Sequence, residues 1–417
     1  MGQDTLALVG EDCLEPRLSR FKRSRQAELT DMPAPDKTSN PRIIFLRGVD
    51  FSNPVGASDW RIALYMPEFG FNTTVLGRGL LPPSKPEGIE LVSMPACQLP
   101  VLETLALSRL YAMEALRRNP DVIIVNPGVA LAGALCKAVN PRIRLVLDIR
   151  TMPVEVRGCA GRIQRAYFDA ILRSNRFDAC SIISEGMLDE LDRQFDLRAR
   201  LPTVVWGSGF DEGIFVPAAA GPDIRHELGL HGKFILMFHG SLSPTRGLGE
   251  VIHGLRLLRD CGEHDVHLLL IGHGAAEPSL RDLATELNVA GQVCCIPPVG
   301  YETIPGWIAA ADLGLDPLPD HPWWRHQAPL KVYEYLAMGK PVLATDLPCH
   351  RDISEAVVLV PENRPLTLAE AILRIKCLPV QERQRLSGVA RRDAQEHTWR
   401  VKAQVLARFL DDLIGRA

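Results

Sequence analysis

The sequence predicts an α/β protein with two domains, each a doubly wound parallel sheet with helices on both faces. Short apolar runs alternate with helix-length amphipathic segments along most of the 417 residues, and this alternation is typical of a parallel sheet. It occurs in two series, the first from Arg42 and the second from Lys233. A chain of this length suits two large domains, and each series is long enough to bury its own core.

The first series contains five short runs that are predicted to be strands. They span residues 43–46, 73–76, 122–125, 144–148 and 180–184. Helices are expected at 58–69, after residue 125, and at about 160–174. The apolar segment 122–139 is interrupted by Asn126 and Lys137, so it indicates a strand, a turn and a helix rather than a membrane span.

The second series repeats the alternation with five further predicted strands. They span residues 234–238, 266–271, 293–296, 313–316 and 342–345. Helices are expected from Leu248, between the second and third of these strands, at about 302–311 and at 330–338. The last helix is followed by Gly339 and Pro341. These residues indicate its end, because glycine permits a left-handed cap and proline prevents the helix from continuing.

These patterns divide the chain into five parts. They are a flexible polar tail, a first domain, a linker rich in Gly, Ala and Pro, a second domain, and a terminal segment with an amphipathic helix at about 398–414. The five parts span residues 1–40, 41–205, 206–222, 223–390 and 391–417.

Composition excludes several classes of protein. The net charge of -3 argues against a nucleic-acid binder. The ten cysteines show no zinc spacing, which favours reduced thiols in a cytosolic protein; Cys294 and Cys295 are expected to be buried in a strand. The first apolar stretch, residues 6–10, is too short for a signal peptide. We therefore expect a soluble, cytoplasmic protein.

Two loops with glycines follow predicted strands, and ligands of parallel sheets bind beyond the carboxyl ends of the strands. The loop 239–247 (HGSLSPTRG) contains Gly240 and Arg246, so backbone N–H groups and a guanidinium can face an anion. The loop 271–274 (IGHG) contains Gly272 and Gly274, which permit close approach of a ligand. Both patterns also occur in ordinary tight turns.

The segment 326–346 carries the strongest chemical signal. Lys331 and Glu334 lie three residues apart and share one face of a predicted helix. A lysine there can neutralise phosphate, and a carboxylate can accept two hydrogen bonds from a ribose diol. The alternative is a solvated intrahelical ion pair worth only about 0.3–0.5 kcal/mol, but apolar neighbours such as Leu330 favour a buried helix.

A family resemblance rests on segments of the second series. The series contains, in order, FHGSLSPTRGLGEVI, LLLIGHGAAEPSLRDLATELNVAGQV, WIAAADLGLDPL and LKVYEYLAMGKPVLATD. They resemble the donor-binding half of retaining GT-B glycosyltransferases, notably glycosyltransferase family 4. CSIISEGMLDEL and WGSGFDEGIFVP are more loosely similar to segments of the first domain and the interdomain region. The resemblance implies two Rossmann-like domains that face a cleft, with the terminal helix returning to the first domain.

The resemblance also assigns roles in the second domain. Glu334 matches the second glutamate of the family's two-glutamate motif, which binds the donor ribose. Gly240 matches the loop glycine, and Arg246 the basic residue that holds the diphosphate. Ser241 stands where an arginine is frequent, and His326 where the first glutamate is expected. The segment around Lys331 resembles a subset of the family with a Pro-x-Lys-x-x-Glu-Tyr pattern, in which this lysine would add a phosphate-binding charge. The predicted donor-binding residues are Gly240, Ser241, Arg246, Gly272, Gly274, His326, Leu330, Lys331 and Glu334.

In the first domain the resemblance is weaker. Gly56 lies in a loop that approaches donor and acceptor in the family, and Arg150 lies in LDIRTMPVE, where a cleft-facing histidine or arginine is usual. We expect Gly56 and Arg150 on the acceptor side, and Arg150 with Arg246 and Lys331 as the catalytic residues. A structural ion pair is the alternative for Arg150.

The implied activity is transfer of a sugar, with retention, from a nucleotide-diphosphate sugar to a glycan or a lipid-linked glycan. Arg246 and Lys331 would stabilise the departing diphosphate. No carboxylate cluster indicates a divalent metal, so we expect no metal and no cofactor besides the donor substrate. The absence of a clear carboxylate nucleophile favours a same-face mechanism. The alternatives are a sugar-nucleotide epimerase, an inverting GT-B enzyme, and a catalytically silent nucleotide-binding scaffold.

Peripheral contact with the inner face of a membrane is a further hypothesis. The basic segment near 160–174 interleaves arginines with apolar residues, a pattern that suits an anionic lipid surface and a lipid-linked acceptor. The alternative, favoured here, is a helix with one buried and one solvated face. The residues concerned are Arg157, Arg162, Arg165, Arg173, Arg176, Tyr167, Phe168, Ile171 and Leu172.

Overall fold

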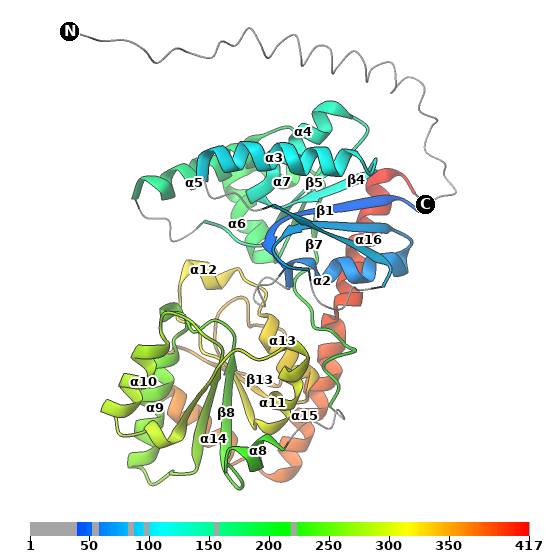
Figure 1. Cartoon of the computed structure of the whole chain (residues 1–417). Coiled ribbons are helices and arrows are strands. Elements are labelled where there is room, and N and C mark those ends of the chain that lie inside the picture. The colour runs from blue at the N-terminus through cyan, green and yellow to red at the C-terminus, as the bar shows by residue number, and fades with distance from the viewer. Residues whose placement is uncertain are drawn as a thin grey trace, which may run out of the picture.

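The structure is a computed structural model, and it describes residues 40–51, 58–81, 87–95, 100–153, 158–217 and 223–416. It contains two parallel sheets, each covered by helices on both faces, which confirms the predicted fold class. Figure 1 shows the two domains one above the other, with α12 and α13 of the second domain facing the first. Apart from Asn40, the predicted tail lies outside the described residues.

The first sheet has seven strands in the order β3-β2-β1-β4-β5-β6-β7, and every pairing is parallel. The predicted strands are confirmed, although the one expected at 180–184 is β6 at 179–182. The prediction missed β3 and β7. The strands are β1 (Arg42–Asp50), β2 (Asn72–Arg78), β3 (Ile89–Met94), β4 (Val122–Val125), β5 (Arg144–Ile149), β6 (Ala179–Ile182) and β7 (Thr203–Val205).

The second sheet has six parallel strands in the order β10-β9-β8-β11-β12-β13. All five predicted strands are present, and β13 was missed. The strands are β8 (Phe234–His239), β9 (Val266–Ile271), β10 (Val293–Ile296), β11 (Leu313–Asp316), β12 (Val342–Thr345) and β13 (Val357–Val360).

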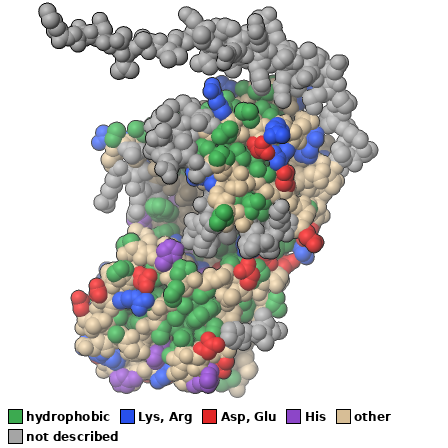
Figure 2. All heavy atoms as spheres, viewed as in Figure 1, with side chains coloured by type: hydrophobic (Ala, Val, Ile, Leu, Met, Phe, Trp, Pro, Cys, Tyr) green, Lys and Arg blue, Asp and Glu red, His purple; other side chains and the backbone are tan. Residues whose placement is uncertain are grey.

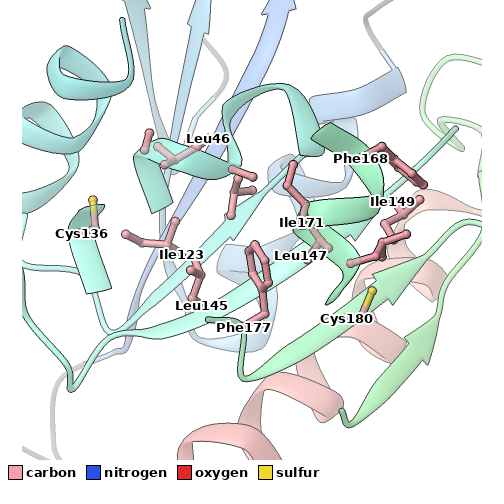
Figure 3. Close-up of a cluster of buried hydrophobic side chains, with 14 of the residues drawn as sticks. Leu46, Ile123, Cys136, Leu145, Leu147, Ile149, Phe168, Ile171, Phe177 and Cys180 are labelled. Atoms are coloured by element: carbon pink, nitrogen blue, oxygen red, sulfur yellow. The ribbon is translucent and has the colours of Figure 1, made fainter. Parts of the chain in front are cut away.

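Helices complete two layers on each sheet. One face of the first sheet packs on α3 to α6, and the other face packs on α2 and α16. Figure 3 shows part of the first of these clusters, including Cys136 of α4 and Ile171 of α5. The first-domain helices are α2 (Ser58–Tyr65), η2 (Met66–Phe69), α3 (Pro100–Leu116), η3 (Pro127–Val129), α4 (Ala130–Val139), α5 (Gly158–Arg173), α6 (Glu185–Phe195) and α7 (Leu197–Arg200).

The second sheet packs on α9, α10 and α14 on one face and on α11, α13 and α15 on the other. The predicted stop of α13 is confirmed, since Gly339 has a φ of +70°. The helices are α8 (Ile224–Glu227), η4 (Pro244–Arg246), α9 (Leu248–Asp260), α10 (Glu277–Glu286), η5 (Ala290–Gln292), η6 (Tyr301–Thr303), α11 (Ile304–Ala310), α12 (Pro322–Arg325), α13 (Leu330–Ala337), α14 (Pro365–Lys376), α15 (Val380–Ala394), η7 (Gln395–His397) and α16 (Trp399–Ile414).

The chain crosses between the domains at two adjacent places. Phe210 and Thr398 form an isolated parallel bridge, in which the N–H of Phe210 donates to the carbonyl of His397 at 2.9 Å and the N–H of Trp399 donates to the carbonyl of Phe210 at 3.0 Å. Beyond this bridge α16 joins the core of the first domain. The predicted return of the terminal helix is therefore present, and α15 runs through the expected boundary at 390.

Two expectations about individual segments need correction or refinement. Cys294 and Cys295 lie in β10 but are only half-buried, because β10 is an edge strand. In α5, the apolar residues Phe168, Ile171 and Leu172 are buried in the first-domain core, so they are not exposed to a membrane. The helix thus has the one buried and one solvated face that we favoured, and Arg157 lies outside the described residues.

The described surface agrees with the small net charge. Figure 2 shows acidic and basic side chains interspersed on the viewed face of both domains. None of the helices within the described ranges is long and apolar enough to span a membrane.

Candidate functional site

The candidate site lies at the carboxyl edge of the second sheet, where the loops after β8, β9 and β11 meet the start of α13. His239 is the last residue of β8 and Asp316 is the last residue of β11. These two strands are adjacent in the sheet, so their final side chains lie close together. Lys331, in the first turn of α13, completes the group.

The two glycine loops pack directly on each other. A Cβ at Gly272 would lie 2.0 Å from the carbonyl oxygen of Gly240, and a Cβ at Gly274 would lie 2.3 Å from that of Leu242. Contact between the loops therefore explains the absence of side chains at Gly272 and Gly274, and their predicted approach to a ligand stays a prediction. A Cβ at Gly240, whose φ is +121°, would meet nothing within 4 Å, so Gly240 and the neighbouring half-buried Ser241 adjoin open space.

Lys331 is held by a carboxylate that the sequence analysis missed. Its Nζ lies 3.2 Å from Oδ1 of the buried Asp316. Lys331 therefore does not form the solvated intrahelical pair with Glu334 that was the alternative interpretation. Burial lowers the pKa of Lys331, and Asp316 opposes this shift.

Asp316 has a second partner, His350, which is also buried. Oδ2 of Asp316 lies 3.0 Å from Nε2 of His350, while Nδ1 of His350 lies 2.7 Å from the carbonyl oxygen of Thr345. Burial alone would raise the pKa of Asp316, but Lys331, His350 and Arg246 hold it well below its usual range.

Arg246 lies against a tryptophan that follows β11. Its guanidinium carbon is 4.4 Å from the centroid of the Trp324 ring, within the range of a cation–π contact. Nε1 of Trp324 donates to the carbonyl of Thr245 at 2.9 Å, so the same indole fixes the loop that carries Arg246. Burial lowers the pKa of Arg246, and its buried Nε makes no hydrogen bond.

Glu334 has an unusual environment for a carboxylate. Its exposed fraction is 1%, and neither carboxylate oxygen makes a well-aligned hydrogen bond. Oε2 lies 3.3 Å from Nε2 of His239. Burial raises the pKa of Glu334 to about 7, although Tyr301 and Lys331 act to lower it. Burial also lowers the pKa of His239 to about 3, so this histidine is neutral near pH 7.

His326 and Leu330 face the first domain. The carbonyl of His326 accepts a hydrogen bond of 2.7 Å from Ser184, which caps α6. Leu330 packs against the first-domain cluster that contains Trp206 and Trp399. The structure therefore places both residues at the domain contact.

The first domain places polar groups at the carboxyl edge of its own sheet. Arg47, which the sequence analysis did not select, is fully buried and forms an ion pair with Asp148. Arg150 donates to the carbonyl of Gly207 at 2.6 Å, and its guanidinium carbon lies 3.6 Å from the centroid of Trp206. Arg150 thus contacts the start of the interdomain linker. Gly56 lies outside the described residues.

No group of three or more His, Cys, Asp or Glu side chains within the described ranges is arranged to hold a metal ion. The charges at the site belong instead to Lys331, Arg246, His350 and Asp316. The three cations among these groups suit an anionic ligand.

Two parallel-sheet domains, joined by two crossovers and a terminal helix that returns to the first domain, define the GT-B architecture. Solved structures share this fold along nearly the whole chain. Sucrose-phosphate synthase from Thermosynechococcus elongatus aligns with a TM-score of 0.71 at 17% identity, over 90% of this chain and 100% of that one. Anabaena Alr3699/HepE, in complex with UDP and glucose, aligns with a TM-score of 0.69 at 21% identity, over 89% and 100%.

A known protein family matches part of the second domain. Residues 233–376 match the family described as "Glycosyl transferases group 1". A D-inositol 3-phosphate glycosyltransferase from Jonesia denitrificans is 30% identical over 177 residues, which cover 40% of each chain. A GDP-mannose-dependent alpha-mannosyltransferase from Mycolicibacterium smegmatis is 27% identical over 222 residues, 52% of this chain and 54% of that one. The matches thus span about half or less of these relatives.

Proposed function

We propose that this protein is a glycosyltransferase that takes its sugar from a nucleotide-diphosphate donor bound at the carboxyl edge of the second sheet. The observation that carries the proposal is the buried Glu334 carboxylate, whose two oxygens lack well-aligned hydrogen bonds. Leaving a buried charged group unpaired is costly, and the two hydroxyls of a ribose would supply the missing donors. Lys331 lies one turn earlier on the same helix, where it would meet the diphosphate.

The family match over 233–376 supports this assignment, because it contains Gly240, Arg246, Lys331 and Glu334. In the proposed reaction the bond between the anomeric carbon and the diphosphate oxygen breaks, and Arg246 and Lys331 stabilise the charge that develops on the leaving group. We further propose retention of configuration by a same-face reaction, in which the departing diphosphate accepts the proton of the acceptor hydroxyl. The two site carboxylates, Asp316 and Glu334, are both engaged in other roles in this scheme.

The acceptor is proposed to be a glycan or a lipid-linked glycan that enters from the first domain. The position of Arg150 at the carboxyl edge of the first sheet supports entry from that side. Contact with a membrane surface would require the exposed arginines of α5 and the exposed Ile163, since Phe168, Ile171 and Leu172 are buried.

A donor screen tests the proposal. Thermal unfolding is followed in the presence of UDP, GDP, ADP and dTDP sugars, because a ligand that binds only the folded state raises Tm. The matching donor should raise Tm for the wild type and much less for Glu334→Ala. If none of the four raises Tm, or if Glu334→Ala responds fully, the assignment of the ribose site is wrong.

The same donor then separates the competing functions. Release of nucleoside diphosphate only when an acceptor is added supports a transferase, and the anomeric configuration of the product, determined by NMR, distinguishes retention from inversion. Rearrangement of the sugar without an acceptor would indicate an epimerase. Binding without any turnover across a panel of acceptors would favour a silent scaffold.

A further inference from the structure

The ring of His350 lies between two hydrogen-bond acceptors. Its Nδ1 is 2.7 Å from the carbonyl oxygen of Thr345, and a carbonyl can only accept, so Nδ1 must carry a hydrogen. Its Nε2 is 3.0 Å from Oδ2 of Asp316. The other oxygen of that carboxylate faces the Nζ of Lys331 at 3.2 Å, which favours the ionised form of Asp316. Nε2 must then donate as well, and a ring with two N–H groups is an imidazolium.

Burial gives this charge its importance. His350 and Asp316 are each 1% exposed, and the Lys331 side chain is 13% exposed. Charges removed from water interact strongly, because little solvent screens them. Cys349 and Asp346 also interact with the His350 ring, and Arg246 acts on Asp316. Burial opposes the charged ring, but the hydrogen bond to Asp316 contributes most to raising the pKa of His350 to about 10.

The local charges do not cancel. His350, Lys331 and Arg246 surround one carboxylate, Asp316, so two positive charges remain unbalanced by it. If His350 were neutral, Asp316 would neutralise Lys331 directly, and the group would retain only one positive charge. A charged His350 therefore determines whether Lys331 is available to an anionic ligand.

We infer that His350 is a permanently charged positioning residue, which holds Asp316 from behind and thereby presents Lys331 to the diphosphate of the donor. This inference rests on the proposed function only for the identity of the ligand. It predicts that His350, which lies behind Asp316 and is 1% exposed, affects diphosphate affinity without affecting the nucleoside part of the site.

Binding of inorganic pyrophosphate, measured by isothermal titration calorimetry at pH 7.5, tests the inference without any need for turnover. His350→Gln keeps a polar side chain but removes the charge, and we expect its affinity for pyrophosphate to fall about tenfold, the equivalent of one pKa unit of interaction between charges. The exposed His231 is the matched control, and His231→Gln should bind like the wild type. The affinity of His350→Gln for the nucleoside of the donor should change less than twofold. Unchanged pyrophosphate affinity, or equal losses for pyrophosphate and nucleoside, would overturn the inference.

A second measurement observes the charge directly in the wild-type protein. Histidine labelled with ¹⁵N should give one buried ring whose two nitrogens both remain protonated at pH 8, and this signal should be missing from His350→Gln. In Asp316→Asn the pKa of the same ring should fall, because burial then acts without the opposing carboxylate, and the ring should have one unprotonated nitrogen at pH 8. A wild-type His350 ring with one unprotonated nitrogen at pH 8 would overturn the inference, even if His350→Gln proves too unstable for calorimetry. The donor screen described above fails or succeeds independently of both results.

Discussion

At the scale of the residue, Glu334 and His239 show how burial sets two protonation states at one site. The two side chains lie 3.3 Å apart, and burial favours the neutral form of each. His239 stays neutral at physiological pH, whereas Glu334, with a pKa of about 7, ionises in the range where the protein works. A ligand that donates hydrogen bonds to the carboxylate would bind the ionised form, so donor affinity should rise as pH increases through 7.

The raised pKa of Glu334 also predicts how stability depends on pH. The folded protein keeps this proton up to about pH 7, while the unfolded chain loses it near the ordinary value of 4.5. The free energy of unfolding should therefore decrease by roughly 3 kcal/mol as the pH rises between these two values, and it should stay level at higher pH. Glu334→Gln should lack this decrease. Urea unfolding of both proteins at pH 5 and pH 8 measures it, and parallel pH dependence would contradict the raised pKa.

The residues predicted from sequence were those whose role follows from local context. Lys331 and Glu334 share a helix face, and Arg246 lies in a loop after a strand. Asp316 was within reach, because it ends a predicted strand at the binding edge of the sheet. The sequence could not predict Tyr301, Trp324 and His350, because each reaches the site only through the packing of segments that are distant in sequence.

At the scale of the element, the contact between the two glycine loops predicts that one alanine substitution acts mainly on stability and another mainly on ligand binding. Gly272→Ala places a Cβ 2.0 Å from a backbone oxygen, which should destabilise the protein by about 2–4 kcal/mol. Gly240→Ala meets no neighbour and costs only backbone strain, about 1–2 kcal/mol. However, its Cβ enters the open space beside the proposed diphosphate, so Gly240→Ala should weaken pyrophosphate binding. Denaturant unfolding and pyrophosphate titration measure the two effects, and a larger binding loss for a refolded Gly272→Ala would contradict this division.

Secondary structure was predicted best for the central strands. β4, β8 and β9 are almost entirely apolar, because both of their faces are covered by helices, and β1 contains the apolar run 43–46. The missed strands β3, β7 and β13 are edge strands, and each has partly exposed positions that weaken the apolar pattern. In the described part of the chain, the hydrophobic pattern thus identifies every strand inside the two sheets but only one of their four edge strands, β10.

At the scale of the whole molecule, a cation from the first domain reaches the proposed donor site. The guanidinium carbon of Arg61, in α2, lies 3.9 Å from the centroid of the Tyr301 ring in the second domain. Arg61 also forms an ion pair of 3.2 Å with Asp211 of the linker. Tyr301 and Arg61 both act to lower the pKa of Glu334, so contact between the domains favours the ionised carboxylate that the donor requires.

Arg61→Gln should therefore weaken both domain contact and donor binding. The loss of a desolvated cation–π contact and an ion pair is expected to reduce donor affinity about fivefold to thirtyfold, or roughly 1–2 kcal/mol. Small-angle scattering should show a larger radius of gyration for the variant. Arg400→Gln, which removes exposed ion pairs with Glu68 and Glu212, is the control and should change little. Equal effects of the two substitutions would show that Arg61 has no special role in coupling the domains.

The return of α16 to the first domain has a consequence for the order in which the protein is made. Trp399, Leu406 and Leu410 belong to the same buried cluster as Ile43 and Phe45 of β1. The ribosome synthesises β1 before α16, so until residue 410 has emerged this side of the first core is covered by α2 but not by α16. The whole second domain is translated in between and can reach its final packing first. Nascent chains should therefore acquire protease resistance in the second domain before the first domain, which is the reverse of the usual N-terminal-first order.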